Sequence, residues 1–179
     1  MSARAQFDLA RRLRGDDPPS LGEVFTFLSG LYFRGKLAYA NAFGRAFVIT
    51  PNRGLLPVDL PVSLDDLRAF AEVDIHEDDP RYRKPLERDV RRLVRQLEPE
   101  AEVVLLGSIA TGKYVDVLLK NFGERLLFPA EFVGRGDMSR GGLLLRCAVD
   151  RRELEYIPVQ GAVRKGKRPP KLEPRRYTK

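Results

Sequence analysis

Apolar positions along the chain alternate between helical spacing and short strand-like runs. From Ser20 onward they recur at three- and four-residue intervals, which predicts a long helix with one buried face: Leu21, Val24, Phe25, Leu28, Leu31 and Tyr32. Ser20 and Glu23 form a capping box at its start, and Gly30 and Gly35 predict a bend. Residues 63–71 predict a short helix opened by Ser63 and Asp66.

Two further helices follow. After Pro80 the pattern predicts a long helix, ended by Pro99, whose buried stripe is Leu86, Val90, Leu93, Val94 and Leu97. Residues 111–122 predict the second, with Gly123 at the position where glycine commonly ends a helix.

Short apolar runs between the helices predict strands at 46–50, 103–106 and 125–128. Beyond the glycine-rich GRGDMSRGG, the runs LLLRCAVD and ELEYIPV predict a β-hairpin around residues 150–152. Strands that alternate with helices favour parallel pairing with helices covering the sheet. The sequence therefore predicts one α/β domain with a Rossmann-like three-layer, mostly parallel sheet and a C-terminal antiparallel hairpin.

Composition narrows the class of protein. The 179 residues suit one domain, and the single Cys147 excludes an internal disulfide and a cysteine-rich zinc site. The amino-terminal segment lacks the apolar core of a signal peptide, and no apolar run is long enough to cross a bilayer. We therefore expect a cytoplasmic protein with no membrane partner and assign no metal.

The net charge of +7 is unevenly distributed. Residues 161–179 hold eight Lys or Arg and one Glu, so the preceding 160 residues are neutral overall. This tail is too polar and proline-rich to form a core. We predict a helical appendage at 1–19, an α/β domain at 20–160, and a basic, flexible tail at 161–179.

Basic residues on the long helix and in the tail indicate a nucleic-acid partner, DNA or RNA. The helix residues recur at three- and four-residue spacing opposite the apolar stripe, and the tail adds a cluster: Arg81, Lys84, Arg88, Arg91, Arg92 and Arg95, with Arg164, Lys165, Lys167 and Arg168. The alternative is a solvated helix face with Glu87 and Arg91 paired, and a tail that only aids solubility or docks on the acidic surface of the protein.

GSIATGKY (107–114) differs at one position from the phosphate-binding P-loop pattern. Tyr114 stands where a Ser or Thr would hold Mg²⁺, and it shares a helix face with Val115 and Leu118, which predicts packing rather than Mg-ATP chemistry. A turn that binds phosphate or a nucleotide remains a hypothesis, as does a plain turn. Its candidate ligands are Gly107, Ser108, Thr111, Gly112 and Lys113.

GRGDMSRGG (134–142) is the second candidate anion loop. Arg135, Ser139 and Arg140 would bind phosphate beside backbone N–H groups, and Asp137 is a weak candidate base. A surface loop with glycine turns is the alternative. If the sheet is parallel, this loop and 107–113 would both lie at the carboxyl ends of strands, where ligands usually bind, and the sequence leaves open whether they share one pocket.

The acidic segment DIHEDD (74–79) contains His76, the other weak catalytic candidate. Its alternative is a solvated linker whose carboxylates next to Pro80 favour the helix N-terminus. No cofactor is assigned, and phosphate or a nucleotide is the ligand class considered.

FVITPNRGLLPVDL, with LYFRGKLAYANAF before it, resembles the YaaA-like group of bacterial proteins. That group follows a strand with Ser-x-x-x-Gly-Leu-Leu-x-Pro-x-Asp. Six residues fall on the pattern, with no residue between the second leucine and the proline: Thr50, Gly54, Leu55, Leu56, Pro57 and Asp59. The resemblance covers residues 20–60, and PVSLDDL replaces the group's next Pro-Tyr segment. It implies an α/β fold and links to oxidative stress and DNA binding.

VVLLGSIAT onward is similar to the open sheet of the uracil-DNA-glycosylase superfamily. Because His76 is the only histidine, that superfamily's late His-Pro-Ser element has no match, and the similarity implies fold rather than chemistry.

The leading functional hypothesis is a nucleic-acid-associated protein. Its alternatives are an enzyme acting on a nucleotide or nucleoside, and a non-catalytic protein-interaction module.

Overall fold

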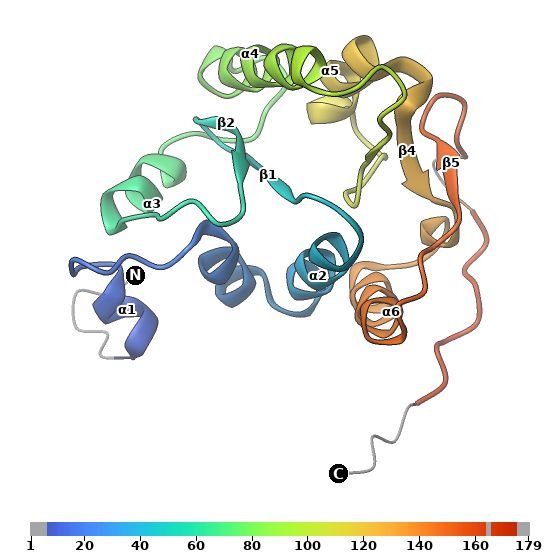
Figure 1. Ribbon diagram of the computed structural model, residues 1–179, viewed down its shortest axis with the longest axis horizontal. Helices are drawn as coiled ribbons and strands as arrows, with labels where there is room; N and C mark the ends of the chain where they lie inside the picture. The colour runs from blue at the N-terminus through green and yellow to red at the C-terminus, as the bar shows by residue number, and fades with distance from the viewer. Residues whose placement is uncertain (1–6, 164–165, 175–179) are drawn as a thin grey trace.

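The computed structural model describes residues 7–163 and 166–174. Figure 1 shows α4 and α5 along the upper edge of the molecule and α2 and α6 along the lower edge, with the strands between them. The helices and strands in chain order are α1 (Asp8–Arg12), α2 (Leu21–Phe43), β1 (Phe47–Thr50), β2 (Gly54–Pro57), α3 (Leu64–Ala71), α4 (Pro80–Gln96), β3 (Val103–Val104), α5 (Gly112–Phe122), η1 (Gly123–Arg125), β4 (Leu126–Pro129), η2 (Ala130–Phe132), α6 (Asp137–Asp150) and β5 (Tyr156–Pro158).

The strands form two small sheets, so the protein is mixed α/β. β1 and β2 make an antiparallel pair with Val48 opposite Leu56, and the second sheet has the order β3-β4-β5. Among the strands of residues 7–163 and 166–174, only β3 and β4 run parallel, since β5 joins the other edge of β4 in the antiparallel sense. The structure does not confirm the predicted Rossmann-like three-layer sheet, and β2 was not predicted at all.

The C-terminal hairpin prediction is wrong because LLLRCAVD lies within helix α6. Gly141, Leu144 and Cys147 are buried at three-residue spacing, which is a helical rather than a strand period. Asp137 to Gly142, predicted as a loop, form the first turns of the same helix. The glycines that suggested a loop instead allow a close helix crossing: a Cβ on Gly141 would lie 2.8 Å from the carbonyl oxygen of Leu31 in α2.

Most helix boundaries agree with the sequence signals. Ser20 with Glu23 and Ser63 with Asp66 form the capping boxes that open α2 and α3. The predicted bend in α2 lies at Gly30, where φ is 63° and ψ is −145°. Across the described residues, no helix combines the length and apolar character that a membrane crossing requires.

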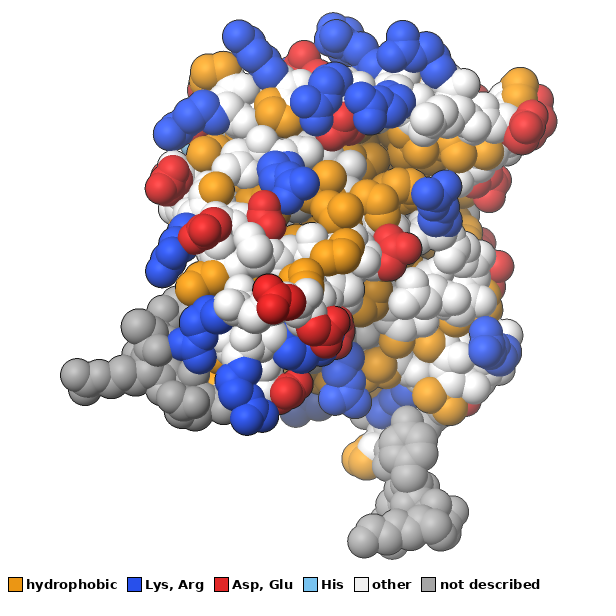
Figure 2. Space-filling model, turned by 60° about the vertical axis from the view of Figure 1, so that its left-hand side comes forward, with side chains coloured by type: hydrophobic (Ala, Val, Ile, Leu, Met, Phe, Trp, Pro, Cys, Tyr) orange, Lys and Arg blue, Asp and Glu red, His pale blue; other side chains and the backbone are white. Residues whose placement is uncertain are grey.

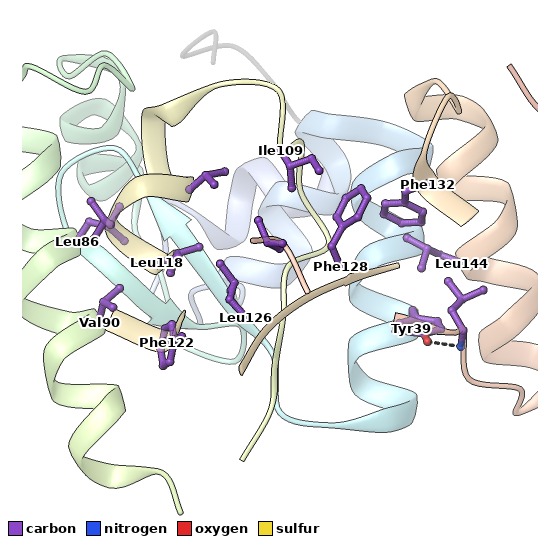
Figure 3. Close-up of a cluster of buried hydrophobic side chains, with 14 of the residues drawn as sticks. Tyr39, Leu86, Val90, Ile109, Leu118, Phe122, Leu126, Phe128, Phe132 and Leu144 are labelled. Carbon is purple, nitrogen blue, oxygen red and sulfur yellow. Dashed lines mark hydrogen bonds between the residues drawn. The ribbon is translucent and has the colours of Figure 1, made fainter. Parts of the chain in front are cut away.

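The main core surrounds β4 and contacts helices on both edges of the molecule. Leu126 and Phe128 of β4 are buried between Leu118 of α5 and Leu144 of α6 (Figure 3). A second cluster contains Leu13, Leu21 and Val24, which joins the N-terminal segment to α2. The predicted N-terminal appendage thus contributes to a hydrophobic cluster.

A pair of tyrosines links α2 to the C-terminal strand. The buried Tyr39 hydroxyl accepts a hydrogen bond of 2.8 Å from the backbone N–H of Leu154, drawn as a dashed line in Figure 3. The same hydroxyl lies 2.6 Å from the hydroxyl of Tyr156 in β5. These bonds satisfy polar groups inside the core, where an unpaired group would cost about 1–3 kcal/mol.

The described part of the tail contacts the segment that precedes α6. Arg135 donates to the carbonyl oxygen of Pro170 at 3.4 Å, and Leu172 packs against the main core. Gly166 lies beside Val133. Lys167 and Arg168 stay exposed, whereas the predicted nucleic-acid residues Arg164 and Lys165 lie outside the described residues.

Candidate functional site

Helix α4 presents a row of basic side chains on the face opposite its buried residues. Asp79 caps its start by accepting from the N–H of Arg81 at 2.8 Å, and Tyr82, Leu86 and Val90 are buried. At 100° per residue, the basic positions fall within roughly 100° of arc, and the row is about 21 Å long. All of its members are exposed, and we call them the α4 stripe: Arg81, Lys84, Arg88, Arg91, Arg92 and Arg95.

Half of the α4 stripe is paired with nearby carboxylates. Arg81 lies 2.6 Å from Asp79, Arg88 lies 2.8 Å from Asp89, and Arg91 lies 3.2 Å from Glu87. Within the part of the chain that the structure describes, no ion pair or hydrogen bond engages the other three side chains: Lys84, Arg92 and Arg95. The Glu87–Arg91 pair that the sequence predicted is confirmed, and the stripe keeps three unneutralised charges within the described residues.

A groove runs beside the α4 stripe, between α4 and the β1–β2 pair. Its volume is about 290 Å³. Figure 2 shows Lys and Arg side chains over α4 at the top of the molecule and hydrophobic side chains gathered below them. We call this feature the α4 groove, and its lining residues are Arg45, Phe47, Leu55, Leu56, Pro57, Arg88, Asp89, Arg92, Leu93 and Gln96.

The charge in the α4 groove is positive, with three arginines against one carboxylate. That carboxylate is Asp89, which is 9% exposed and accepts hydrogen bonds from Arg88 and from the backbone N–H of Leu55. At the other end, the Arg45 guanidinium lies 5.2 Å from the centroid of the Phe47 ring. Sequence reasoning missed Arg45 and Phe47, since nothing in their local pattern joins them to residues of α4 some forty positions later.

The 107–113 segment leads into the N-terminus of α5, as predicted, but carboxylates face that terminus. A Cβ on Gly112 would lie 2.5 Å from an Asp116 carboxylate oxygen and 3.0 Å from one of Glu77. Thr111 occupies the N-cap without a side-chain hydrogen bond, and Lys113 is exposed. The helix dipole thus meets the protein's own negative charge where the phosphate hypothesis needs an anion.

Tyr114 lies against the core, which confirms its predicted packing role. Its ring packs against the main cluster, and its hydroxyl donates to the carbonyl oxygen of Ser108 at 2.8 Å. Burial raises the pKa of Tyr114. Gly107 is adjacent, because a Cβ there would lie 2.8 Å from the tyrosine hydroxyl. The segment is held by its own contacts rather than arranged around a Mg²⁺ position.

The two arginines of GRGDMSRGG form hydrogen bonds with other groups of the protein. Arg135 donates to the carbonyl oxygen of Glu131 at 2.9 Å and to the hydroxyl of Ser139 at 3.2 Å, besides its bond to the tail. Arg140 donates to the carbonyl oxygen of Phe132 at 3.0 Å and lies 3.9 Å from Asp137. These contacts fasten the tail and the start of α6, and they engage several of the donors that a phosphate would need, although the buried Nε of Arg140 has no hydrogen-bond partner among the described residues.

The two predicted anion loops approach each other through Tyr32 of α2. Its hydroxyl donates to the carbonyl oxygen of Leu106 at 3.1 Å, and its ring meets Phe132 edge-on. The Lys36 ammonium lies 4.0 Å from the centroid of the same ring. Burial raises the pKa of Tyr32 to about 12 and lowers the pKa of Lys36. The rings of Tyr32 and Phe132 and the Lys36 ammonium therefore lie between the ends of the two segments.

The DIHEDD segment caps the N-terminus of α4 through Asp79. The exposed His76 accepts a hydrogen bond from the N–H of Asp78 at 3.2 Å, and Asp79 is the helix cap that the sequence predicted. A hydrogen bond from Arg81 lowers the pKa of Asp79. Among the described residues, no group of His, Cys, Asp and Glu side chains could hold a metal ion.

Comparison of the chain with protein-family models, with curated proteins and with solved structures found no match. The α4 stripe and the α4 groove are therefore interpreted from their own geometry and chemistry.

Proposed function

We propose that this protein binds nucleic acid through the α4 stripe. The observation that carries the proposal is the row of six exposed basic side chains along one face of α4, three of which have no ion-pair partner in the described part of the chain. Polyanions bind such rows by releasing condensed counterions, and this mode of binding requires no enclosed pocket.

The geometry of α4 also supports binding to a phosphate backbone. Its apolar face is buried, so the helix position is fixed while the basic face remains in solvent. Arg88 and Arg91 are already held by Asp89 and Glu87, which orients their guanidinium groups at the surface. Lys84, Arg92 and Arg95 supply the charge that is free to meet phosphates.

The test compares two variants that lose the same net charge. Lys84, Arg92 and Arg95 are replaced by alanine in one, which we expect to weaken binding to a fluorescent oligonucleotide by tenfold or more. The slope of log affinity against log salt should become shallower by about 0.7–0.9 for each phosphate contact removed. Fluorescence anisotropy titrations at several salt concentrations measure both quantities.

The control replaces three exposed basic residues that lie outside α4: Arg34, Arg68 and Lys120. It should bind nearly as well as the unaltered protein, since both variants lose three formal positive charges from different parts of the surface, although Arg68 lies 2.8 Å from Asp65 whereas the three substituted stripe residues are unpaired within the described part of the chain. Equal losses in both variants, or no binding by the unaltered protein, would refute a specific role for the stripe.

A further inference from the structure

We infer that the α4 groove takes an unstacked base, so that the protein prefers single-stranded nucleic acid to duplex. This inference rests on the proposed function, because it assumes that the α4 stripe binds the backbone. Arg88 and Arg92 belong to both features. A strand whose phosphates follow the stripe would therefore carry its bases past the mouth of the groove.

Flat and apolar surfaces line the groove next to the arginines. Phe47 lies in β1 opposite Pro57, and both line the groove together with Leu55, Leu56 and Leu93. The Arg45 guanidinium over the Phe47 ring adds a second planar group. Aromatic rings and guanidinium planes are the groups on which proteins stack bases of single strands.

The polar groups of the groove fit one nucleotide of a strand, with its base and its phosphate. Gln96 can donate to and accept from a base edge, and Arg92 has no hydrogen-bond or ion-pair partner within the described residues. The carboxylate of Asp89 is already bound by Arg88 and Leu55, so its repulsion of a phosphate is reduced. Charge complementarity therefore favours an anionic ligand with a planar apolar part.

The size of the groove favours a single planar group. Its volume of about 290 Å³ lies just below the ~300–1,000 Å³ range of small-molecule sites. In a duplex the base faces are stacked on their neighbours, so an apolar slot finds only base edges and sugar-phosphate. A single strand can place one base into the slot at little cost.

The experiment titrates the full chain with three probes of equal length, about 12 nucleotides, within the range that single-strand-binding folds cover. They are a thymidine strand, the corresponding duplex, and a baseless deoxyribose-phosphate strand with the same charge. We expect the thymidine strand to bind at least tenfold more tightly than the other two. Replacing Phe47 by leucine should remove most of that preference, and replacing it by tryptophan should keep it.

Phe27→Leu is the matched control, since Phe27 is an exposed aromatic residue of α2 outside the groove. Thermal melting of each variant verifies that it is folded. The inference is overturned if the baseless strand or the duplex binds as tightly as the thymidine strand, or if folded Phe47→Leu keeps the preference. In those cases the proposed function stands, whereas it fails if none of the probes binds.

Discussion

At the scale of single residues, Glu23 shows how one side chain can join two elements. Its carboxylate accepts from the backbone N–H of Ser20 at 2.8 Å and from the Arg12 guanidinium at 2.9 Å. The first bond caps α2 and the second holds α1 against it. Hydrogen bonds from Arg12 and then from Ser20 lower the pKa of Glu23 to about 2.

Replacing Glu23 by glutamine should therefore destabilise the protein in a pH-dependent way. The side chain is 48% exposed, so solvent screening limits the expected loss to about 1 kcal/mol in the free energy of unfolding near pH 7. Because the folded pKa lies below the ordinary value of about 4.3, this contribution is complete above about pH 5. It is lost as pH falls toward 2, and urea denaturation at several pH values measures it.

Glu124→Gln is the control for this measurement, since Glu124 is exposed and has no hydrogen bond or ion pair in the described residues. Its free energy of unfolding should follow that of the unaltered protein at every pH. A Glu23→Gln deficit that stayed constant down to pH 2 would contradict the role given to the carboxylate charge.

At the scale of elements, two glycines set the distance between α2 and α6. A Cβ on Gly35 would lie 2.5 Å from the carbonyl oxygen of Gly141, so the two helix backbones are in direct contact. Gly142, one position further along α6, meets only the Leu172 side chain, at 3.6 Å. Adjacent glycines of one helix therefore have different roles.

Gly141→Ala should lower the free energy of unfolding by about 2 kcal/mol, because the added methyl must push two backbones apart. Gly142→Ala should be neutral or stabilise by up to about 1 kcal/mol, since alanine favours helix and the contact is ordinary. Chemical denaturation of the two variants measures both values. Similar effects at both positions would mean that the backbones of α2 and α6 are not in direct contact at Gly141.

The contact between Gly35 and Gly141 also shows which elements the sequence could predict and which it could not. Caps and stripes are local signals, and Ser20, Ser63 and Pro80 mark real helix starts. The run from Gly141 to Cys147 fits either a strand or a helix locally, and only packing against Gly35 of α2 decides between them. For the candidate site, helical spacing in the sequence predicted the α4 stripe. The α4 groove could not be predicted, because only the folded chain brings Phe47 and Arg92 to the same groove.

At the scale of the whole molecule, the positive charge is divided between separate regions. Figure 1 shows α4 along the upper edge, whereas the described part of the tail descends on the other side, beyond α6. The described tail segment, which holds the exposed Lys167, Arg168 and Lys171, therefore lies away from α4. One short strand lying on α4 would not contact both regions.

We expect the two regions to contribute independently to nucleic-acid binding. Alanine substitution of Lys167, Arg168 and Lys171 and the triple substitution in α4 should have additive effects on the free energy of binding a long strand, within about 0.5 kcal/mol. A double-mutant cycle by anisotropy at fixed salt tests this. Coupling well beyond that margin would indicate that tail and helix bind one segment together.

The hydrogen bonds of Tyr39 bear on how the chain folds while it is being synthesised. Its hydroxyl is paired by Leu154 and Tyr156, residues more than a hundred positions later. During synthesis from the N-terminus, α2 therefore exists for most of the chain's growth without the groups that complete it. Contacts of such sequence separation slow folding, because a long loop must close before they form. The nascent chain carries an unfinished core until β5 has been made.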